Sequence, residues 1–286
     1  MTCNRHTTKS IMKELTTKEI QQLSLDILED VHQFCKKNDI KYSLAYGSLI
    51  GAIRHKGFIP WDDDVDIFMP RQDYERFCKL YHSDRYKLIC ESDPDYYLNY
   101  GRVYEDRQTC IKTRLPFAKK YEGGLWIDVF PMDGANDDHD KFIAKMRKLQ
   151  RCWFLQLRYR NALGPVSNIF KAPNLKDFCI LLTLKLFCPL RKKLKENNDY
   201  IRKEAKEFAF GETSRWSDFC CINVKDNNYH LVEEFDKVEE TDFDGHRFYI
   251  LQGYDKVLRR RYGDYMQLPP EDQRVSRHGH VTYYWK

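Results

Sequence analysis

The stretch PWDDDVDI, residues 60–67, sets four carboxylates within five positions directly before an apolar run. Like charges this close repel one another and raise their own pKa values unless a cation shares their charge. Alternate side chains of a strand lie on the same face, so Asp62, Asp64 and Asp66 are expected to face one way, with Val65 and Ile67 toward the core. The pattern predicts a buried strand that begins at a cation site.

A divalent metal ion is the cation that suits this spacing. Asp64 and Asp66 offer oxygen ligands on a rigid support to a hard ion such as Mg²⁺, with Mn²⁺ as the alternative, and substrate phosphates would complete the shell. Asp128 supplies a further carboxylate for a second ion. It lies in the apolar run LWIDVF, residues 125–130, where an isolated charge is costly. Asp133, in the polar sequence MDGAND, is instead predicted to be a solvated loop residue.

A phosphate site is predicted upstream, at Gly47 and Ser48. A strand is expected before this pair and an apolar helix after it. A glycine turn before a helix presents free backbone N–H groups and the positive end of the helix dipole, and the serine adds a hydroxyl donor. Gly47 by itself is most simply a turn residue. The aspartate cluster downstream makes an anion site the better interpretation.

The aspartate pattern was compared with three other kinds of site. A calcium EF-hand would need glycine where Ile67 stands and glutamate where Asp73 stands, so it is rejected. The spacing of Asp62, Asp63 and Asp66 matches prenyl-diphosphate synthases, which carry this motif on helices, whereas the flanks here are strand-like. The triplet DVD, residues 64–66, also matches the DxD motif of nucleotide-sugar glycosyltransferases. That alternative stays open.

The order of apolar runs predicts an α+β fold. Thr16 and Glu19 have the spacing of a capping box, so a helix is expected to begin there and to end near Asn38. Residues 1–135 are predicted to be a catalytic core in which strands and helices alternate. Its expected strands after the first are 64–69, 100–104, 109–114 and 125–130.

Helical spacing dominates the next part of the chain. Residues 136–228 are therefore predicted to be a helical insertion, with helices over 139–163 and 175–210. Residues 229–286 carry a hairpin signal, Asp244-Gly245, and a last helix near 254–262. This C-terminal segment is expected to complete the site within one compact domain.

Composition excludes several classes of protein. Hydrophobic residues make up 42% of the chain and charged residues 32%, which is typical of a folded globular protein. The net charge of +5 gives no polycationic signature, so no nucleic-acid partner is expected. The N-terminus lacks a signal-peptide h-region and the ten cysteines lack C-x-x-C spacing. Both features predict reduced thiols and a cytoplasmic protein.

The most apolar run, FCILLTLKLFCPL, covers Phe178 to Leu190. It is too short to span a bilayer. A buried core helix is the simplest expectation. The alternative is an interfacial helix in peripheral contact with the inner face of the membrane, because basic residues follow the run.

Three blocks resemble one family. YGSLIGAIRHKGFIPWDDDVDI (46–67), WIDVFPMDG (126–134) and YGDYMQLPP (262–270) are similar to the LicD family of phosphorylcholine transferases, in the nucleotidyltransferase superfamily and related to the fukutin-type proteins. The resemblance implies a nucleotidyltransferase-fold core, a mixed β-sheet flanked by helices, with a helical insertion and a C-terminal helical segment. The phosphate turn of the family matches Gly47 and Ser48, its metal pair Asp64 and Asp66, and its third carboxylate Asp128.

Further contacts are expected from basic residues. Arg54, His55 and Lys56 lie in a segment that should form a loop over the site and contact phosphate. Arg277 and His278 are candidate ligands of the nucleotide or of the acceptor phosphate. Other basic residues of the C-terminal part, among them Arg259 to Arg261, are expected to be mostly surface charge.

The resemblance implies a metal-dependent phosphotransferase. The donor would be CDP-linked, most simply CDP-choline, and the acceptor a hydroxyl of a cell-surface glycan precursor, such as lipopolysaccharide or teichoic acid, which could be lipid-linked. Asp64 and Asp66 would hold two ions, and Asp128 would hold one and could accept the hydroxyl proton. CDP-ribitol or CDP-glycerol donors remain open, as does a non-catalytic member of the fold that binds glycan or nucleotide.

Overall fold

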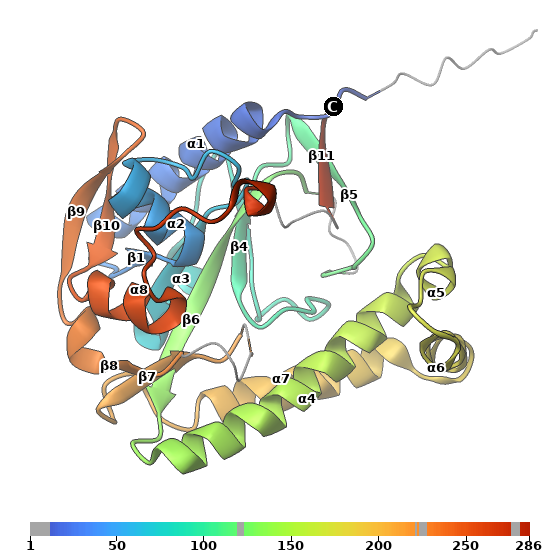
Figure 1. The fold of residues 1–286 in the computed structure, drawn as a ribbon. Coiled ribbons are helices and arrows are strands. Elements are labelled where there is room, and N and C mark those ends of the chain that lie inside the picture. Colours follow the sequence, from blue (N-terminus) through green and yellow to red (C-terminus); the bar gives the residue numbers. More distant parts are fainter. Residues whose placement is uncertain (1–11, 119–122, 221, 223–227, 276–280) are drawn as a thin grey trace, which may run out of the picture.

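The computed structural model describes residues 12–118, 123–220, 222, 228–275 and 281–286 (Figure 1). Within these residues the chain has an α+β architecture with a seven-stranded mixed sheet and two smaller sheets of two strands each. One path across the main sheet follows the order β1 (Ser43–Leu44), β2 (Asp66–Pro70), β6 (Trp126–Ala135), β4 (Gly101–Tyr104) and β3 (Lys87–Ile89).

The central pair of this sheet, β2 and β6, is parallel and aligns Asp66 with Asp128. The strand predicted at 64–69 begins only at Asp66, and residues 62–64 precede it in an irregular segment. The expectation that Asp62, Asp64 and Asp66 share one strand face is therefore wrong. β6 is longer than predicted, and its second half pairs with β7 (Arg215–Asp218), which pairs in turn with β8 (His230–Leu231).

Helices α1 (Thr17–Lys37) and α3 (Arg71–Leu80) pack against β6, and α3 also packs against β2. The predicted capping box is confirmed, because Thr16 Oγ accepts a hydrogen bond from Glu19 N while the Glu19 carboxylate accepts one from Thr16 N. The helix ends at Lys37 with Asn38 as its C-cap. The core between these elements includes Leu28, Val31, Ile67, Phe77 and Val129.

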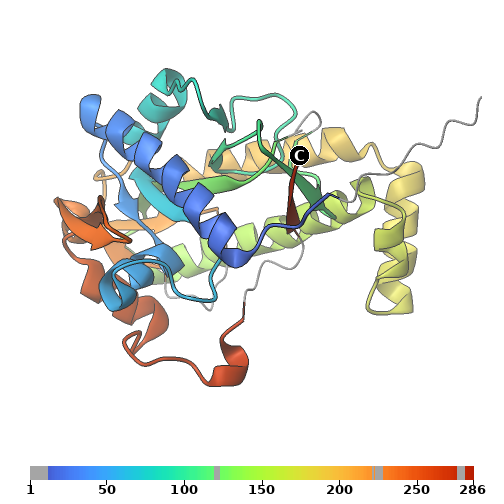
Figure 2. The same ribbon diagram turned by 90° about the horizontal axis from the view of Figure 1, so that it is seen from above.

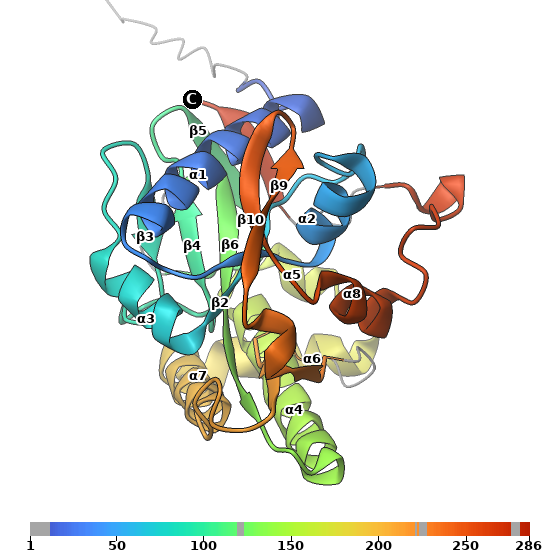
Figure 3. The same ribbon diagram turned by 90° about the vertical axis from the view of Figure 1, so that its left-hand side faces the viewer.

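The predicted hairpin at Asp244-Gly245 is also confirmed. It joins β9 (Val238–Phe243) to β10 (His246–Leu251), and both turn residues have positive φ, as a two-residue hairpin turn requires. The hairpin lies beside the edge strand β1 (Figure 1) and faces the viewer in Figure 3. Leu251 N donates to Ser43 Oγ at 2.9 Å. The other small sheet pairs β5 (Thr109–Thr113) with the C-terminal β11 (Val281–Trp285).

The helical part contains α4 (His139–Leu163), α5 (Ser167–Phe170), α6 (Leu175–Phe187) and α7 (Leu190–Ala205). The long helices α4 and α7 pack against each other along the sheet, and α5 and α6 lie at the far end of this pair (Figures 1 and 2). After α7 the chain returns to the main sheet as β7, so the interval 136–228 contains a sheet strand as well as helices.

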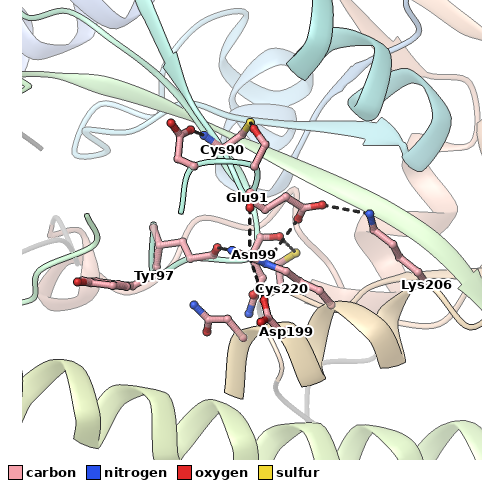
Figure 4. Close-up of polar contacts among 12 residues, drawn as sticks. Cys90, Glu91, Tyr97, Asn99, Asp199, Lys206 and Cys220 are labelled. Carbon is pink, nitrogen blue, oxygen red and sulfur yellow. Dashed lines mark hydrogen bonds and ion pairs between the residues drawn. The ribbon is translucent and has the colours of Figure 1, made fainter. Parts of the chain in front are cut away.

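A polar network fixes α4 and α7 to the segment that leads into β4 (Figure 4). Arg202 donates to the carbonyl oxygens of Glu91, at 3.2 Å, and Leu98, at 2.7 Å. Gln156 donates to the Tyr97 carbonyl at 2.6 Å. Lys206 lies 3.3 Å from the Glu91 carboxylate. These bonds satisfy the carbonyl groups of Glu91, Tyr97 and Leu98 and thereby set the path of the chain into β4.

Asp133 is not the solvated loop residue that its polar neighbours predict. It lies in β6 with 1% of its surface exposed, and it accepts two hydrogen bonds from Arg71, from Nε at 2.8 Å and from Nη2 at 2.7 Å. Arg71 also contacts Glu91 at 3.1 Å. Burial raises the pKa of the Asp133 carboxyl, and the guanidinium of Arg71 opposes that rise. The pair ties α3 to the centre of the sheet.

We expect Asp133→Asn to lower the free energy of unfolding by about 3 kcal/mol, because it leaves a buried guanidinium with less compensation. Urea unfolding followed by circular dichroism measures this change. The matched control is Asp242→Asn on β9, whose side chain is 69% exposed and should change stability by less than about 0.5 kcal/mol. Equal stability of the two variants would contradict the assigned role of the Arg71–Asp133 pair.

Candidate active site

A cavity of about 250 Å³ lies where β2, β4 and β6 meet the C-terminal segment. Acidic, basic and aromatic side chains share its wall, which is the composition of a site for a charged substrate with an apolar part. The lining residues are Tyr46, Asp63, Asp64, Asp66, Tyr100, Arg102, Trp126, Asp128, Phe130, Arg261, Val281 and Tyr283.

The three predicted metal ligands all line this cavity. Asp66 and Asp128 are register partners on neighbouring parallel strands, and Asp64 reaches the cavity from the segment before β2. Burial raises the pKa of Asp66 well above its ordinary value, and the charges of Asp64 and Asp128 raise it further. Asp66 is thus held in its charged form only at a cost, which a cation in the cavity would remove.

The donor set fits a hard divalent ion that is also bound by substrate. Within the described part of the chain, no three His, Cys, Asp or Glu side chains already form a metal cage. Mg²⁺ does not require one, since it is commonly held by one or two carboxylates with phosphates and water completing its octahedron. Asp64 and Asp66 fit that requirement. Asp128 is already engaged by an arginine.

That arginine is Arg102 on β4, which sequence reasoning missed. Its Nε donates to Asp128 Oδ1 at 2.6 Å, and its guanidinium lies 4.0 Å from the centre of the Trp126 ring. The side chain is buried, and its Nη1 has no hydrogen-bond partner among the residues that the structure describes. A buried donor of this kind at a cavity wall suits an anionic ligand.

Gly47 and Ser48 lie behind the carboxylates and do not line the cavity. They belong to α2 (Tyr46–Ile50). A Cβ at Gly47 would lie 2.6 Å from Asp62 Oδ2, so a larger residue there would displace the Asp62 side chain. Ser48 is buried, and its Oγ accepts a hydrogen bond from Asp66 N at 3.0 Å. In this arrangement the pair fixes the first residue of β2.

Arg54 and His55 do not form the predicted loop over the site. They end a π-helix, η1 (Gly51–His55), and Lys56 follows it as the C-cap. Arg54 Nη1 donates to the carbonyls of Tyr265, at 2.5 Å, and Gln267, at 3.2 Å. Arg54 thus fastens the C-terminal segment, and none of the three basic residues lines the cavity. Arg277 and His278 lie outside the described residues.

Helix α8 (Tyr254–Tyr262) brings in another unexpected residue, Arg261. Its side chain is 13% exposed, lies 3.9 Å from Asp218 and stacks 4.3 Å from the Tyr46 ring centre, so its prediction as surface charge is wrong. Neighbouring arginines on a helix point about 100° apart. Arg259 faces solvent beside Asp255, and Arg260 donates to both carboxylate oxygens of buried Glu234. The run of three arginines was therefore a signal that not all of them can face solvent, and both Arg260 and Arg261 face the protein.

Nine of the twelve cavity residues fall within a recognised family domain. Residues 39–165 match the family model described as "LicD/FKTN/FKRP, nucleotidyltransferase domain". Over 278 residues the chain is 30% identical to the "Lipopolysaccharide cholinephosphotransferase LicD" of Haemophilus influenzae, which covers 95% of this chain and 99% of that protein. The chain belongs to the LicD family.

Two uncharacterized proteins of Rickettsia are also similar. One, from Rickettsia prowazekii, is 47% identical over 148 residues, half of this chain and 51% of that protein. The other, from Rickettsia typhi, is 42% identical over 70 residues, 24% of this chain and 23% of its own length. The LicD domain match includes Asp64, Asp66, Arg102 and Asp128, whereas Arg261 lies outside it.

We expect Asp66→Asn to stabilise the metal-free protein by about 1 kcal/mol, because it removes a buried charge that two carboxylates repel. Mg²⁺ at 100 times its dissociation constant should stabilise the wild type by about 2.7 kcal/mol and the variant much less. Thermal unfolding with and without Mg²⁺ measures both effects, with Asp242→Asn as the control. An equal Mg²⁺-dependent shift in Asp66→Asn and wild type would remove Asp66 from the metal site.

Proposed function

We propose that this member of the LicD family transfers phosphorylcholine from CDP-choline to a hydroxyl of a lipopolysaccharide-type glycan precursor, with Mg²⁺ as cofactor. The observation that carries the proposal is the aligned pair Asp66 and Asp128, in one cavity with Asp64 and two arginines. The name of the Haemophilus influenzae relative supports the choice of phosphorylcholine and of the acceptor.

The carboxylates have separate tasks in this reaction. Asp64 and Asp66 would hold the metal, which supplies charge neutralisation for the pyrophosphate and lowers the pKa of the attacking hydroxyl. Asp128 is oriented by Arg102, whose Nε donates to Oδ1 at 2.6 Å. Among the described residues, Oδ2 makes the weaker contact, 3.5 Å from Nη2. Oδ2 is therefore the oxygen available to accept the hydroxyl proton of the acceptor.

The arginines would bind the phosphate groups of the donor. Arg261 and Arg102 reach the cavity from different elements, one from α8 and one from β4. Arg102 lines the cavity, and its positive charge is shared with Asp128. Positively charged donors held in place before the reaction stabilise the charge that develops during phosphoryl transfer. The reaction needs no covalent nucleophile from the protein.

Aromatic side chains favour choline over an alditol. Tyr100, Phe130 and Tyr283 line the cavity, and Tyr100 and Phe130 lie 4.5 Å apart between ring centres. The rings of Trp126 and Tyr46 already lie closest to a protein cation, Arg102 and Arg261 respectively. Arg102 also lies 5.6 Å from the centre of the Tyr100 ring. An aromatic wall that already holds guanidinium groups is of the kind that receives a trimethylammonium group through cation–π contact. Ribitol and glycerol have no cationic group that would gain from such a wall.

We expect Mg²⁺-dependent release of CMP from CDP-choline and little from CDP-ribitol or CDP-glycerol, with a deacylated lipopolysaccharide core as acceptor. Asp64→Asn should lower the rate at least about 100-fold, as for other main electrostatic contributors. Asp242→Asn, an aspartate on the exposed hairpin, should keep the wild-type rate. Release from CDP-ribitol or CDP-glycerol instead would reassign the headgroup. No release from any donor by folded protein would reject the transferase.

A neighbouring pair of arginines gives a sharper test of phosphate binding. Arg261→Gln should lower kcat/KM for CDP-choline about 10- to 100-fold, the range expected for a lost hydrogen bond to a charged group. Arg259→Gln, two residues away on the exposed face of α8, should leave kcat/KM unchanged. Steady-state CMP release measures both. If the two variants are equally active, Arg261 does not bind the donor.

A further inference from the structure

Helix α6 presents its apolar residues to solvent. Leu175, Cys179, Leu182 and Leu186 recur at intervals of four, three and four residues, so they form one face of the helix, and all four are exposed. Leu175 is 77% exposed and Phe187 at the end of the helix 81%. Phe170 of α5 adds a side chain that is 75% exposed. Leu181 is the one residue of α6 that is classed as buried.

The one lysine inside the apolar run points toward the end of α4. Lys185 Nζ donates to the carbonyls of Ala162, at 2.9 Å, and Gly164, at 2.8 Å, at the C-terminus of α4. A lysine there satisfies carbonyl groups that the helix leaves free and complements its dipole. The charge thus anchors α6 to α4 and orients the leucine face outward. The prediction of a buried core helix is wrong, because the leucine face is exposed. An ordinary amphipathic helix would turn such a face toward the core.

The same segment is strongly basic. Residues 166–193 contain six lysines and arginines and one acidic residue, Asp177, so their net charge of +5 equals that of the whole chain. Asp177 is itself within 3.5 Å of Arg158. Five of the six basic residues are exposed: Lys171, Lys176, Arg191, Lys192 and Lys193. Apolar side chains flanked by exposed cations are typical of helices that lie in the interface of an anionic bilayer.

The position of α6 suits such a surface. In Figures 1 and 2, α5 and α6 lie apart from the main sheet, at the end of the α4–α7 pair. α6 has 13 residues, fewer than the ~20 needed to cross a bilayer, so it would lie along the interface. No helix in the described ranges is long and apolar enough to span a membrane.

We propose that α5 and α6 dock this protein on an anionic phospholipid membrane. The exposed face of Leu175, Leu182 and Leu186 enters the interface, together with the exposed rings of Phe170 on α5 and Phe187 at the end of α6. The surrounding lysines and arginines bind lipid phosphate groups. This inference does not rest on the proposed reaction, because it uses none of the residues of the cavity.

The test is sedimentation of the full chain with vesicles of phosphatidylglycerol and phosphatidylethanolamine, compared with vesicles of phosphatidylcholine. We expect binding to the anionic vesicles, weakened by salt. The double variant Leu186→Gln/Phe187→Gln should lower the partition coefficient at least about tenfold. Lys171→Glu/Lys176→Glu should lower it about fivefold or more for each charge reversed. The matched control is Leu80→Gln, an exposed leucine at the end of α3, and it should bind like wild type.

Three results would overturn the proposal. Wild-type protein that stays in the supernatant with anionic vesicles excludes the membrane as the partner. Unchanged binding of Leu186→Gln/Phe187→Gln, with circular dichroism like that of wild type, excludes the apolar face. Dimers in analytical ultracentrifugation that this variant converts to monomers, without vesicle binding, would assign the face to a second copy of the chain. Because neither CDP-choline nor a glycan acceptor is present in these experiments, none of the results depends on transferase activity.

Discussion

The parallel pairing of β2 with β6 is the constraint on which the site depends. It places Asp66 opposite Asp128 at the start of both strands, where a third carboxylate, Asp64, also reaches the cavity. Two strands that carried only apolar residues here would pair more favourably, because the carboxylates repel one another and raise the pKa of Asp66. The apolar core beneath the strands offsets this repulsion. A cationic ligand such as the proposed Mg²⁺ would turn this repulsion into binding energy.

The positive charges that balance these carboxylates come from arginines on separate elements. Arg102 orients Asp128 from β4, Arg261 approaches from α8, and Arg71 satisfies the deeper Asp133. The position of Arg102 depends in turn on α4 and α7, because Arg202 and Gln156 bind the segment that leads into β4. The helical part is thus a support for the site, although none of its described residues lines the cavity wall.

Local sequence was sufficient for features whose cause is local. The aspartate cluster and its apolar flank identified Asp64, Asp66 and Asp128 as residues of one cavity, and the capping box and the hairpin turn were found for the same reason. Asp133 and Arg261 were misjudged because their surroundings are set by partners far away in the chain, such as Arg71, 62 residues from Asp133. The loop expected at residues 54–56 failed because carbonyls of the C-terminal segment bind Arg54.

The burial of α6 was unpredictable for a different reason. Apolar residues occur on all sides of this helix, so the sequence does not show which side meets the rest of the protein. Lys185 decides the matter, because its ammonium group binds the C-terminal carbonyls of α4 and so selects the side that faces inward. The leucines on the other side are then exposed by the same contact. α4 also carries Gln156, which binds the segment that leads into β4. The same helix therefore helps to position the β4 wall of the cavity and to orient the apolar face of α6. Docking through α6 would therefore hold the cavity at a set height and direction relative to a lipid surface.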